Sequence, residues 1–128
     1  GVYDGTTYLA IDARNAAGAA VYSCNNGLEG GGNVANSKGM YITSRVVSTE
    51  HKLYKNGTSI DTGADNSTGV PSGDVYVLAY NDESSVNGIT TRQVSCFFAG
   101  AGLSQDAINT ITDAIETCMD AMGTGVID

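Results

Sequence analysis

The first hundred residues alternate apolar and polar side chains, a period of two that is typical of half-buried β-strands. Residues 7–14 (TYLAIDAR) follow this pattern, and Val21 and Tyr22 lie in the strand predicted next, after a turn at Gly18. Residues 39–47 (GMYITSRVV) predict a third strand. The positions of that strand that we expect to face the core are Met40, Ile42, Ser44 and Val46.

Further along the chain, residues 74–82 (DVYVLAYND) are apolar on both faces, which predicts a central strand covered on both sides. Residues 91–102 (TRQVSCFFAGAG) predict another strand. Turn-forming residues between these segments predict loops. The predicted loops are residues 25–33, which hold four glycines, residues 62–73, which hold the only proline, and residues 82–90.

One hairpin is specified by its turn. Asn56-Gly57 lies at the centre of residues 51–63 (HKLYKNGTSIDTG). A two-residue type I′ turn requires positive φ at both central positions, and Asn-Gly meets that requirement best. The turn also fixes the strand register, and the opposed pairs that it predicts are Lys55 with Thr58, Tyr54 with Ser59, Leu53 with Ile60, and Lys52 with Asp61.

The period changes near the end of the chain. Between Ile108 and Met122 the apolar residues recur three and four positions apart, which predicts an amphipathic helix over about 105–122. Ser104 suits the N-cap and Gly123 suits the position that ends the helix. The same spacing fits a coiled-coil seam of about two heptads, but we favour packing of this helix onto the sheet.

Short strands separated by Gly and Asn turns, followed by a single helix, indicate a mainly β protein. We expect an antiparallel β-sandwich, jelly-roll-like in arrangement, with the C-terminal amphipathic helix over one end or edge. The sequence shows no internal repeat and no interdomain linker, so residues 1–128 form a single domain or a fragment of one.

Charge narrows the classes of partner. The net charge is −8, and six basic residues spread along the chain cannot neutralise a run of phosphates. We therefore expect no nucleic-acid partner. An anionic membrane surface is disfavoured for the same reason, and no apolar run approaches the ~20 residues of a membrane-spanning helix, so we expect no membrane insertion.

The cysteines and the histidine predict no catalytic or metal site. The three cysteines, an odd number, argue against a closed disulfide framework. Cys96 and Cys118 have apolar neighbours, which favours buried free thiols. His51, the single histidine, has charged neighbours and is expected at the surface, without a catalytic triad or a zinc site.

Carboxylates are plentiful but scattered. No alternating acidic run places two carboxyl groups ~5 Å apart on one strand face, as a retaining glycosidase requires, and Asp12, Asp61 and Asp74 appear isolated. Two acidic loops, residues 61–68 (DTGADNST) and 80–84 (YNDES), leave calcium as an alternative to ordinary polar turns. We expect no other cofactor and name no metal ligand.

Tyrosine dominates the aromatic residues, with seven tyrosines and no tryptophan. A tyrosine ring on a sheet can stack on a sugar while its hydroxyl contacts water. Tyr41, Tyr54 and Tyr80 are the candidates for such contacts. Asn81 and Asp82, which follow Tyr80 directly, complete the set of candidate binding residues.

Four motifs appear in a characteristic order. They are GMYITSR at 39–45, LYKNG at 53–57, VYVLAYN at 75–81, and RQVSCFFAGAGLSQDAINTI at 92–111. In this order they resemble the C-terminal half of concanavalin A-like, laminin-G-like jelly-roll domains of bacteriophage structural proteins, such as tail fibres and other virion appendages.

The resemblance covers residues 39–122, and the earlier strands fit it more loosely. Leu78 stands where such domains usually carry a small residue, and the frequent basic ending is missing. Such sandwiches usually contain more strands than 128 residues supply. The resemblance therefore implies a fragment, or a core completed by a neighbouring subunit or by more of a longer chain.

Taken as a guide to function, the resemblance implies a non-enzymatic virion or extracellular domain with a lectin-like role in host attachment through surface glycan or another receptor. It implies other virion proteins as partners, and a homo-oligomer or a larger chain. A purely structural module that joins or decorates virion proteins is the alternative, and a jelly-roll enzyme that degrades polysaccharide is the second. Fold analogy carries this inference, and it assigns no catalytic residue.

Overall fold

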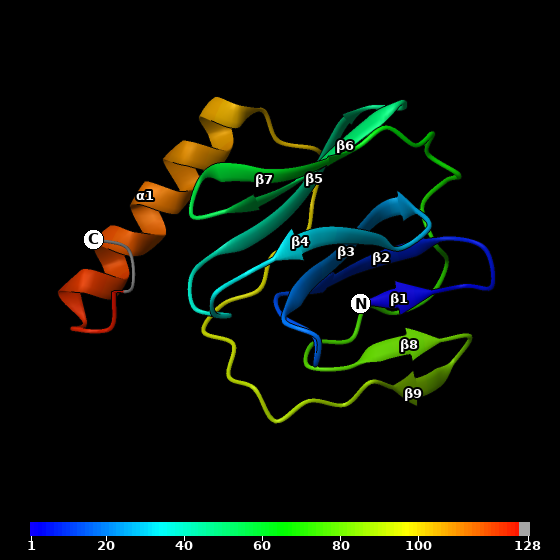
Figure 1. Cartoon of the computed structure of the whole chain (residues 1–128), viewed down its shortest axis with the longest axis horizontal. Helices are drawn as coiled ribbons and strands as arrows, with labels where there is room; N and C mark the ends of the chain where they lie inside the picture. Colours follow the sequence, from blue (N-terminus) through cyan, green and yellow to red (C-terminus); the bar gives the residue numbers. More distant parts are fainter. Residues whose placement is uncertain (126–128) are drawn as a thin grey trace.

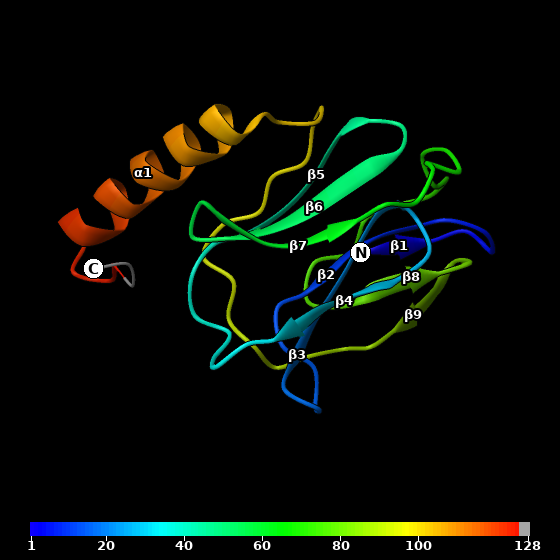
Figure 2. The same cartoon turned by 45° about the horizontal axis from the view of Figure 1, so that its top comes forward.

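A computed structural model describes residues 1–125 and shows three layers: a six-stranded sheet, a three-stranded sheet and one helix (Figures 1 and 2). This arrangement confirms the predicted mainly β sandwich with a C-terminal helix. The elements are β1 (Val2–Tyr3), β2 (Tyr8–Asp12), β3 (Ala19–Asn26), β4 (Glu29–Asn33), β5 (Tyr41–Val47), β6 (Glu50–Lys55), β7 (Thr58–Gly63), β8 (Tyr80–Asp82), β9 (Ser85–Asn87) and α1 (Gln105–Ala121).

The six-stranded sheet has the order β4-β3-β2-β1-β8-β9, and the three-stranded sheet has the order β5-β6-β7. All neighbouring strands are antiparallel except β1 and β8. That parallel pair sets Val2 opposite Asn81 and Tyr3 opposite Asp82. The N-terminal strand therefore lies between two segments that are far apart in the sequence.

Two small apolar clusters hold the layers together. Leu53 of β6 packs on Ala20 and Tyr22 of β3, between the two sheets. On the opposite side of the three-stranded sheet, Tyr54 packs with other buried residues beneath α1. The members of this second cluster are Ile42, Tyr54 and Ile108. Because Leu53 and Tyr54 are neighbours on one strand, they point to opposite faces, and the three-stranded sheet forms the middle layer.

Helix α1 is confirmed within one residue of its expected end. Ser104 is the N-cap, and its hydroxyl accepts a hydrogen bond from the backbone N–H of Ala107. Gly123, just past the end, has φ +70°, a conformation that glycine adopts at little cost. The buried residues of the helix are Ile108 and Thr112. The helix packs on the sheet through this N-terminal half, while its other half extends past the sheets (Figures 1 and 2).

The β6–β7 hairpin has the predicted Asn-Gly turn, with φ of +51° at Asn56 and +77° at Gly57. Lys55 pairs with Thr58 and Tyr54 with Ser59, as expected. Beyond these pairs the predicted register is wrong, because a bulge inserts Ile60 as an extra residue. The observed pairs are Leu53 with Asp61, Lys52 with Thr62, and His51 with Gly63.

Four predicted segments have a different structure. Residues 25–33 were expected to form a loop, but β4 lies there and pairs with β3. The expected strand 74–82 is reduced to β8, and Leu78 has φ +63°, which interrupts an extended backbone. Residues 91–102 form no strand. Residues 82–90, expected as a loop, contain β9. Alternation of apolar and polar residues shows that a segment could form a strand with one apolar face. It does not show whether another strand lies beside the segment to pair with it.

Burial differs from the prediction at several positions, and the loss of the strand at 91–102 accounts for one of them, Cys96. Cys96 is exposed and so is Cys118, on the half of α1 beyond the sheet; Cys24 is the buried free cysteine. In β5, Ile42 and Ser44 are buried as expected, but Val46 is exposed near the strand end. The prediction of buried thiols at Cys96 and Cys118 is therefore wrong.

Candidate functional site

Three tyrosines from three strands gather on one face of the six-stranded sheet. Tyr3 lies opposite Tyr8 in the β1–β2 ladder, and their rings stack with centroids 4.0 Å apart and planes 16° apart. On the other side of β1, β8 sets Asp82 opposite Tyr3, and Tyr80 lies two residues earlier on the same face of β8, diagonal to Tyr3. All three side chains are half-buried. We call Tyr3, Tyr8 and Tyr80 the tyrosine platform.

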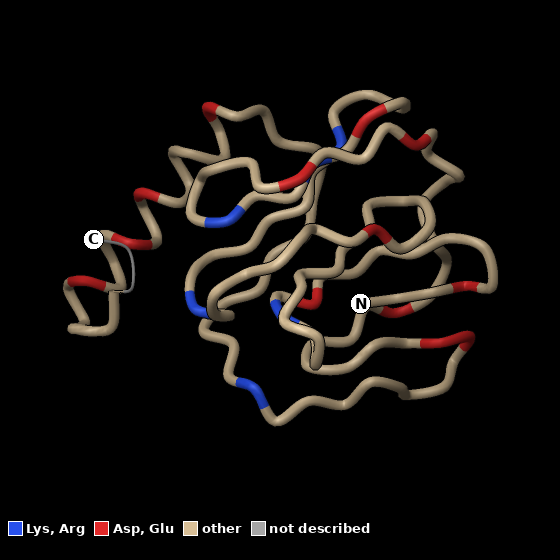
Figure 3. The backbone as a smooth tube through the Cα atoms, viewed as in Figure 1, with Lys and Arg blue, Asp and Glu red and all other residues tan. Residues whose placement is uncertain are grey.

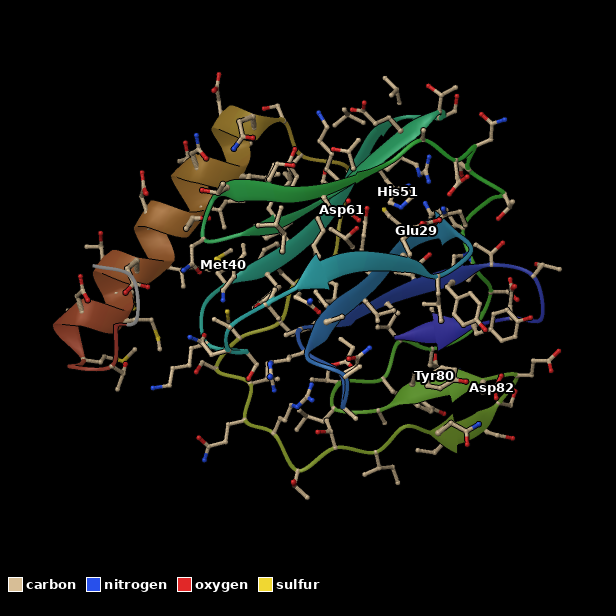
Figure 4. The ribbon with its side chains drawn as sticks, in the orientation of Figure 1. Glu29, Met40, His51, Asp61, Tyr80 and Asp82 are labelled. Atoms are coloured by element: carbon tan, nitrogen blue, oxygen red, sulfur yellow. The ribbon has the colours of Figure 1, made fainter. Side chains whose placement is uncertain are left out.

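Polar groups border the platform. Asp82 alternates with Tyr80 on the same face of β8, and Figure 4 shows the two labelled side chains close together. Partial burial first, and then the charge of Asp82 and a hydrogen bond to it, raise the pKa of Tyr80. The Asn87 amide donates to Asp82 Oδ2 at 2.8 Å. A carboxylate and an amide therefore lie beside half-buried aromatic rings.

A cleft of about 280 Å³ opens next to Tyr3. Asp4 and Glu83 contribute carboxylates to its lining, and Asn81 lines it as well. The Asp4 carboxylate accepts backbone hydrogen bonds from Ser72 at 2.9 Å and Thr7 at 3.0 Å. These bonds, the largest coming from Ser72, lower the pKa of Asp4 to about 2. Asp4 is therefore ionised at neutral pH and organises the wall of the cleft.

The sequence-based candidates separate into two places. Tyr80, Asn81 and Asp82 lie at the platform and its cleft, although the Asn81 amide is buried and is bonded to Asp74 O and Ser84 N. The other two candidates belong to the middle layer. Tyr54 is 5% exposed in the core under α1, and Tyr41 packs against the core between the sheets, with Lys55 Nζ 5.4 Å from its ring centroid.

Tyr3 and Tyr8 were missed by sequence reasoning. They are the first and last residues of the short segment YDGTTY, residues 3–8, in which Asp4-Gly5 is a turn signal. A hairpin across that turn places the two tyrosines opposite each other, as the structure shows. The signal was therefore present in the sequence, but its consequence depends on β1 having a partner strand.

A second group of polar side chains lies between the sheets. His51, expected at the surface, is 1% exposed, so that prediction is wrong. It shares a face of β6 with Leu53, and its ring lies against the bare Cα of Gly63, where a Cβ would come within 2.5 Å of it. The alternation of His51 with Leu53 was the sequence signal for this burial, and the charged neighbours of His51 obscured it.

Arg45 fixes the charge state of this histidine. Arg45 Nη2 lies 2.7 Å from His51 Nδ1. Because a guanidinium can only donate, Nδ1 accepts and the neutral ring carries its proton on Nε2. That Nε2 has no hydrogen-bond partner among residues 1–125. Burial first, and then the charge of Arg45, lower the pKa of His51.

Three acidic side chains converge near His51, which corrects the expectation that Asp61 is isolated. Glu29 and Asp65 share a hydrogen bond, which together with burial and the charges of Asp65 and Asp61 raises the pKa of Glu29. Figure 4 shows Glu29 on the six-stranded sheet facing His51 and Asp61 on the three-stranded sheet. Burial and the charge of Asp61 also raise the pKa of Tyr22.

The histidine makes stability depend on pH. Its pKa in the folded protein lies below the ordinary value of 6.5, so below that pH the unfolded chain binds the proton more readily. We expect the free energy of unfolding to fall between about pH 7 and pH 5.5, by at most about 1.4 kcal/mol per pH unit. Urea denaturation at the two pH values measures it.

The control for this prediction is His51→Gln, which should lose the pH dependence in this range. Glu29 has a raised pKa, so its contribution increases the free energy of unfolding as the pH falls towards its ordinary value of 4.5. This is opposite in sign to the contribution of His51, and Glu29→Gln separates the two. A wild-type stability that is flat from about pH 7 to 5.5, with Glu29→Gln equally flat, would contradict the assignment of a neutral buried histidine.

Within residues 1–125, no group of three or more His, Cys, Asp or Glu side chains could hold a metal ion. The acidic loops considered for calcium are thus not arranged as such a group. In the same part of the chain, no helix combines the length and the apolar character needed to cross a membrane.

Comparisons of the chain with protein-family models, curated proteins and solved structures found no match. The resemblance to phage jelly-roll domains therefore stays a prediction from the motifs, and the tyrosine platform is the structural feature that bears on binding.

Proposed function

We propose that this chain is a non-enzymatic, lectin-like domain of a bacteriophage appendage that binds host-surface glycan through the tyrosine platform. The observation that carries the proposal is the grouping of Tyr3, Tyr8 and Tyr80 on an outer sheet face beside Asp82. Sugar rings present apolar C–H faces and polar hydroxyl edges. Half-buried aromatic rings bordered by a carboxylate and an amide complement both.

The platform is held rigid by its setting. Each tyrosine lies on a paired strand, and the Tyr3–Tyr8 stack fixes two rings against each other. Asp82 is positioned by Asn87 on the adjacent strand. Rigid aromatic side chains lose little conformational entropy on binding, so this surface is suited to a weak, repeated contact of the kind that multivalent attachment strengthens.

The test is a glycan array of bacterial surface polysaccharides, followed by affinity measurement on any hit. Tyr3→Ala and Tyr80→Ala should each weaken binding by about tenfold, equivalent to about 1.4 kcal/mol. Tyr3→Phe is the matched control, because it keeps the ring and should keep most of the affinity. Absence of any glycan ligand, or equal affinity of wild type and both alanine variants, would contradict the proposal.

A joining role within a virion is the second candidate, favoured by an exposed apolar stretch. Ile89 is 77% exposed and Phe97 57%, and Val94 and Phe98 are also exposed. Within residues 1–125 this stretch pairs with no strand. Hydroxyl-radical footprinting distinguishes the roles: Phe97 and Phe98 protected in an assembled particle but reactive in the isolated chain would support joining, and equal reactivity in both would oppose it.

A further inference from the structure

A second cleft, of about 500 Å³, lies between the β6–β7 turn and α1. It is at the opposite end of the molecule from β1, β8 and β9 (Figure 1). Its volume falls within the usual range of small-molecule sites. None of its lining residues belongs to the tyrosine platform, so the inference drawn from it does not depend on the proposed function.

The side chains that line this cleft all carry polar groups. Hydroxyls come from Thr58, Ser59 and Thr112, carboxamides from Gln105 and Asn109, and a carboxylate from Asp113. Within residues 1–125, no aromatic, aliphatic or basic side chain lines it, and Figure 3 shows Asp and Glu but no Lys or Arg along α1. An anionic ligand would meet a carboxylate without a compensating cation, and an apolar ligand would leave the lining hydroxyls and carboxamides without hydrogen-bond partners.

Thr112 supplies an independent sign of a missing partner. It is 3% exposed, and its hydroxyl forms no hydrogen bond with any residue of the described chain. Thr110 and Thr117 on the same helix each donate to the backbone carbonyl four residues earlier, at 2.9 Å and 2.8 Å. Thr112 does not use that bond. A buried hydroxyl without a partner costs free energy, and a ligand hydroxyl would remove that cost.

Acceptors are already aligned next to this hydroxyl. The Gln105 amide nitrogen donates to Gly57 O at 2.7 Å and to Asn109 Oδ1 at 2.8 Å. A Cβ on Gly57 would lie 3.1 Å from Asn109 Oδ1 and 3.9 Å from Thr112 Oγ1, so the bare turn keeps this region open. Gln105 is exposed. When its side chain turns outward, both acceptors become available to a ligand donor.

We propose that this cleft is a second carbohydrate site, which binds a neutral, hydroxyl-rich sugar residue. The sugar hydroxyls donate to Asp113, Gly57 O and Asn109 Oδ1, and one exchanges a hydrogen bond with the Thr112 hydroxyl. This site recognises the pattern of sugar hydroxyls through hydrogen bonds alone, whereas the tyrosine platform offers aromatic rings on which a sugar can stack.

The test is an NMR titration of the ¹⁵N-labelled chain with glucose, galactose or N-acetylglucosamine, and with glucosamine as a cationic probe. At millimolar concentrations we expect at least one neutral sugar to shift the backbone amides of Gly57, Asn109 and Thr112. No such shift, a shift with glucosamine alone, or shifts confined to Tyr3, Tyr8 and Tyr80 would overturn the proposal.

Variants separate binding from folding. Thr112→Val should weaken binding by about threefold to tenfold while leaving the melting temperature unchanged or higher, because the deleted hydroxyl has no partner. Asp113→Asn, at an exposed position, should weaken binding by about tenfold. Thr110→Val is the matched control and should bind normally. Full affinity in both Thr112→Val and Asp113→Asn would also overturn the proposal.

Discussion

Leu53→Ala is expected to lower the free energy of unfolding by about 2–5 kcal/mol. Leu53 is fully buried and is the residue of the middle sheet that packs on Ala20 and Tyr22 of the outer sheet. Truncation loses its apolar burial and leaves a cavity between two sheets whose backbones are held by ladders. Since small domains have about 5–15 kcal/mol of stability in total, urea denaturation should show a large drop in midpoint.

Leu28→Ala is the matched control, because Leu28 is half exposed near the β3–β4 turn and its truncation should cost less than about 0.5 kcal/mol. Gly31→Ala tests the contact itself, since a Cβ there would lie 2.5 Å from Leu53 Cδ2. Alone it should destabilise by about 1–3 kcal/mol, but much less in the Leu53→Ala background. Additive effects of the two substitutions would contradict this packing.

Arg45→Lys is expected to lower the free energy of unfolding by about 2–4 kcal/mol. The guanidinium donates to Cys24 O at 2.7 Å, to Ser48 O at 2.8 Å and to Asp65 O at 2.7 Å, and also contacts His51. Cys24 belongs to the outer sheet, so one side chain joins both sheets and the loop after β7. A lysine ammonium cannot reproduce this planar set of donors.

Arg14→Lys is the control for Arg45, because the Arg14 side chain makes one bond, from Nε to Val34 O at 3.1 Å. We expect it to cost less than about 1 kcal/mol. Because lysine keeps the positive charge at this position, Arg45→Lys should keep most of the pH dependence assigned to His51. Thermal unfolding that does not distinguish the two variants would show that the four contacts of Arg45 contribute little.

The elements that could be predicted are those specified by local chemistry. The Asn56-Gly57 turn and helix α1 with its Ser104 cap depend on residues within a few positions of each other. The bulge at Ile60 does not depend on such local chemistry. It shifts the register of β7 so that Asp61, not Ile60, lies opposite Leu53. Register beyond the turn is therefore decided by the opposing layer, not by the hairpin sequence.

The candidate site was predictable in part for the same reason. Tyr80 and Asp82 were named from composition, and the structure places them together at the platform. Tyr3 and Tyr8 join them only because β1 lies between β2 and β8. His51 was misassigned because neighbouring charges were weighed above strand alternation. Likewise the glycine-rich β4 pairs with β3 and leaves room for Leu53. The need for glycine there comes from a residue on the other sheet, so the local sequence did not indicate a strand.

The parallel pairing of β1 with β8 has a consequence for the order of assembly. Val2 and Asn81 are distant in sequence. Pairing them closes a long loop, which costs conformational entropy and raises the contact order of the fold. The Asn-Gly hairpin and the helix form from local contacts and should appear early. The tyrosine platform, which needs β1, β2 and β8 together, should close late, so a ribosome-bound chain acquires it only after β8 has emerged.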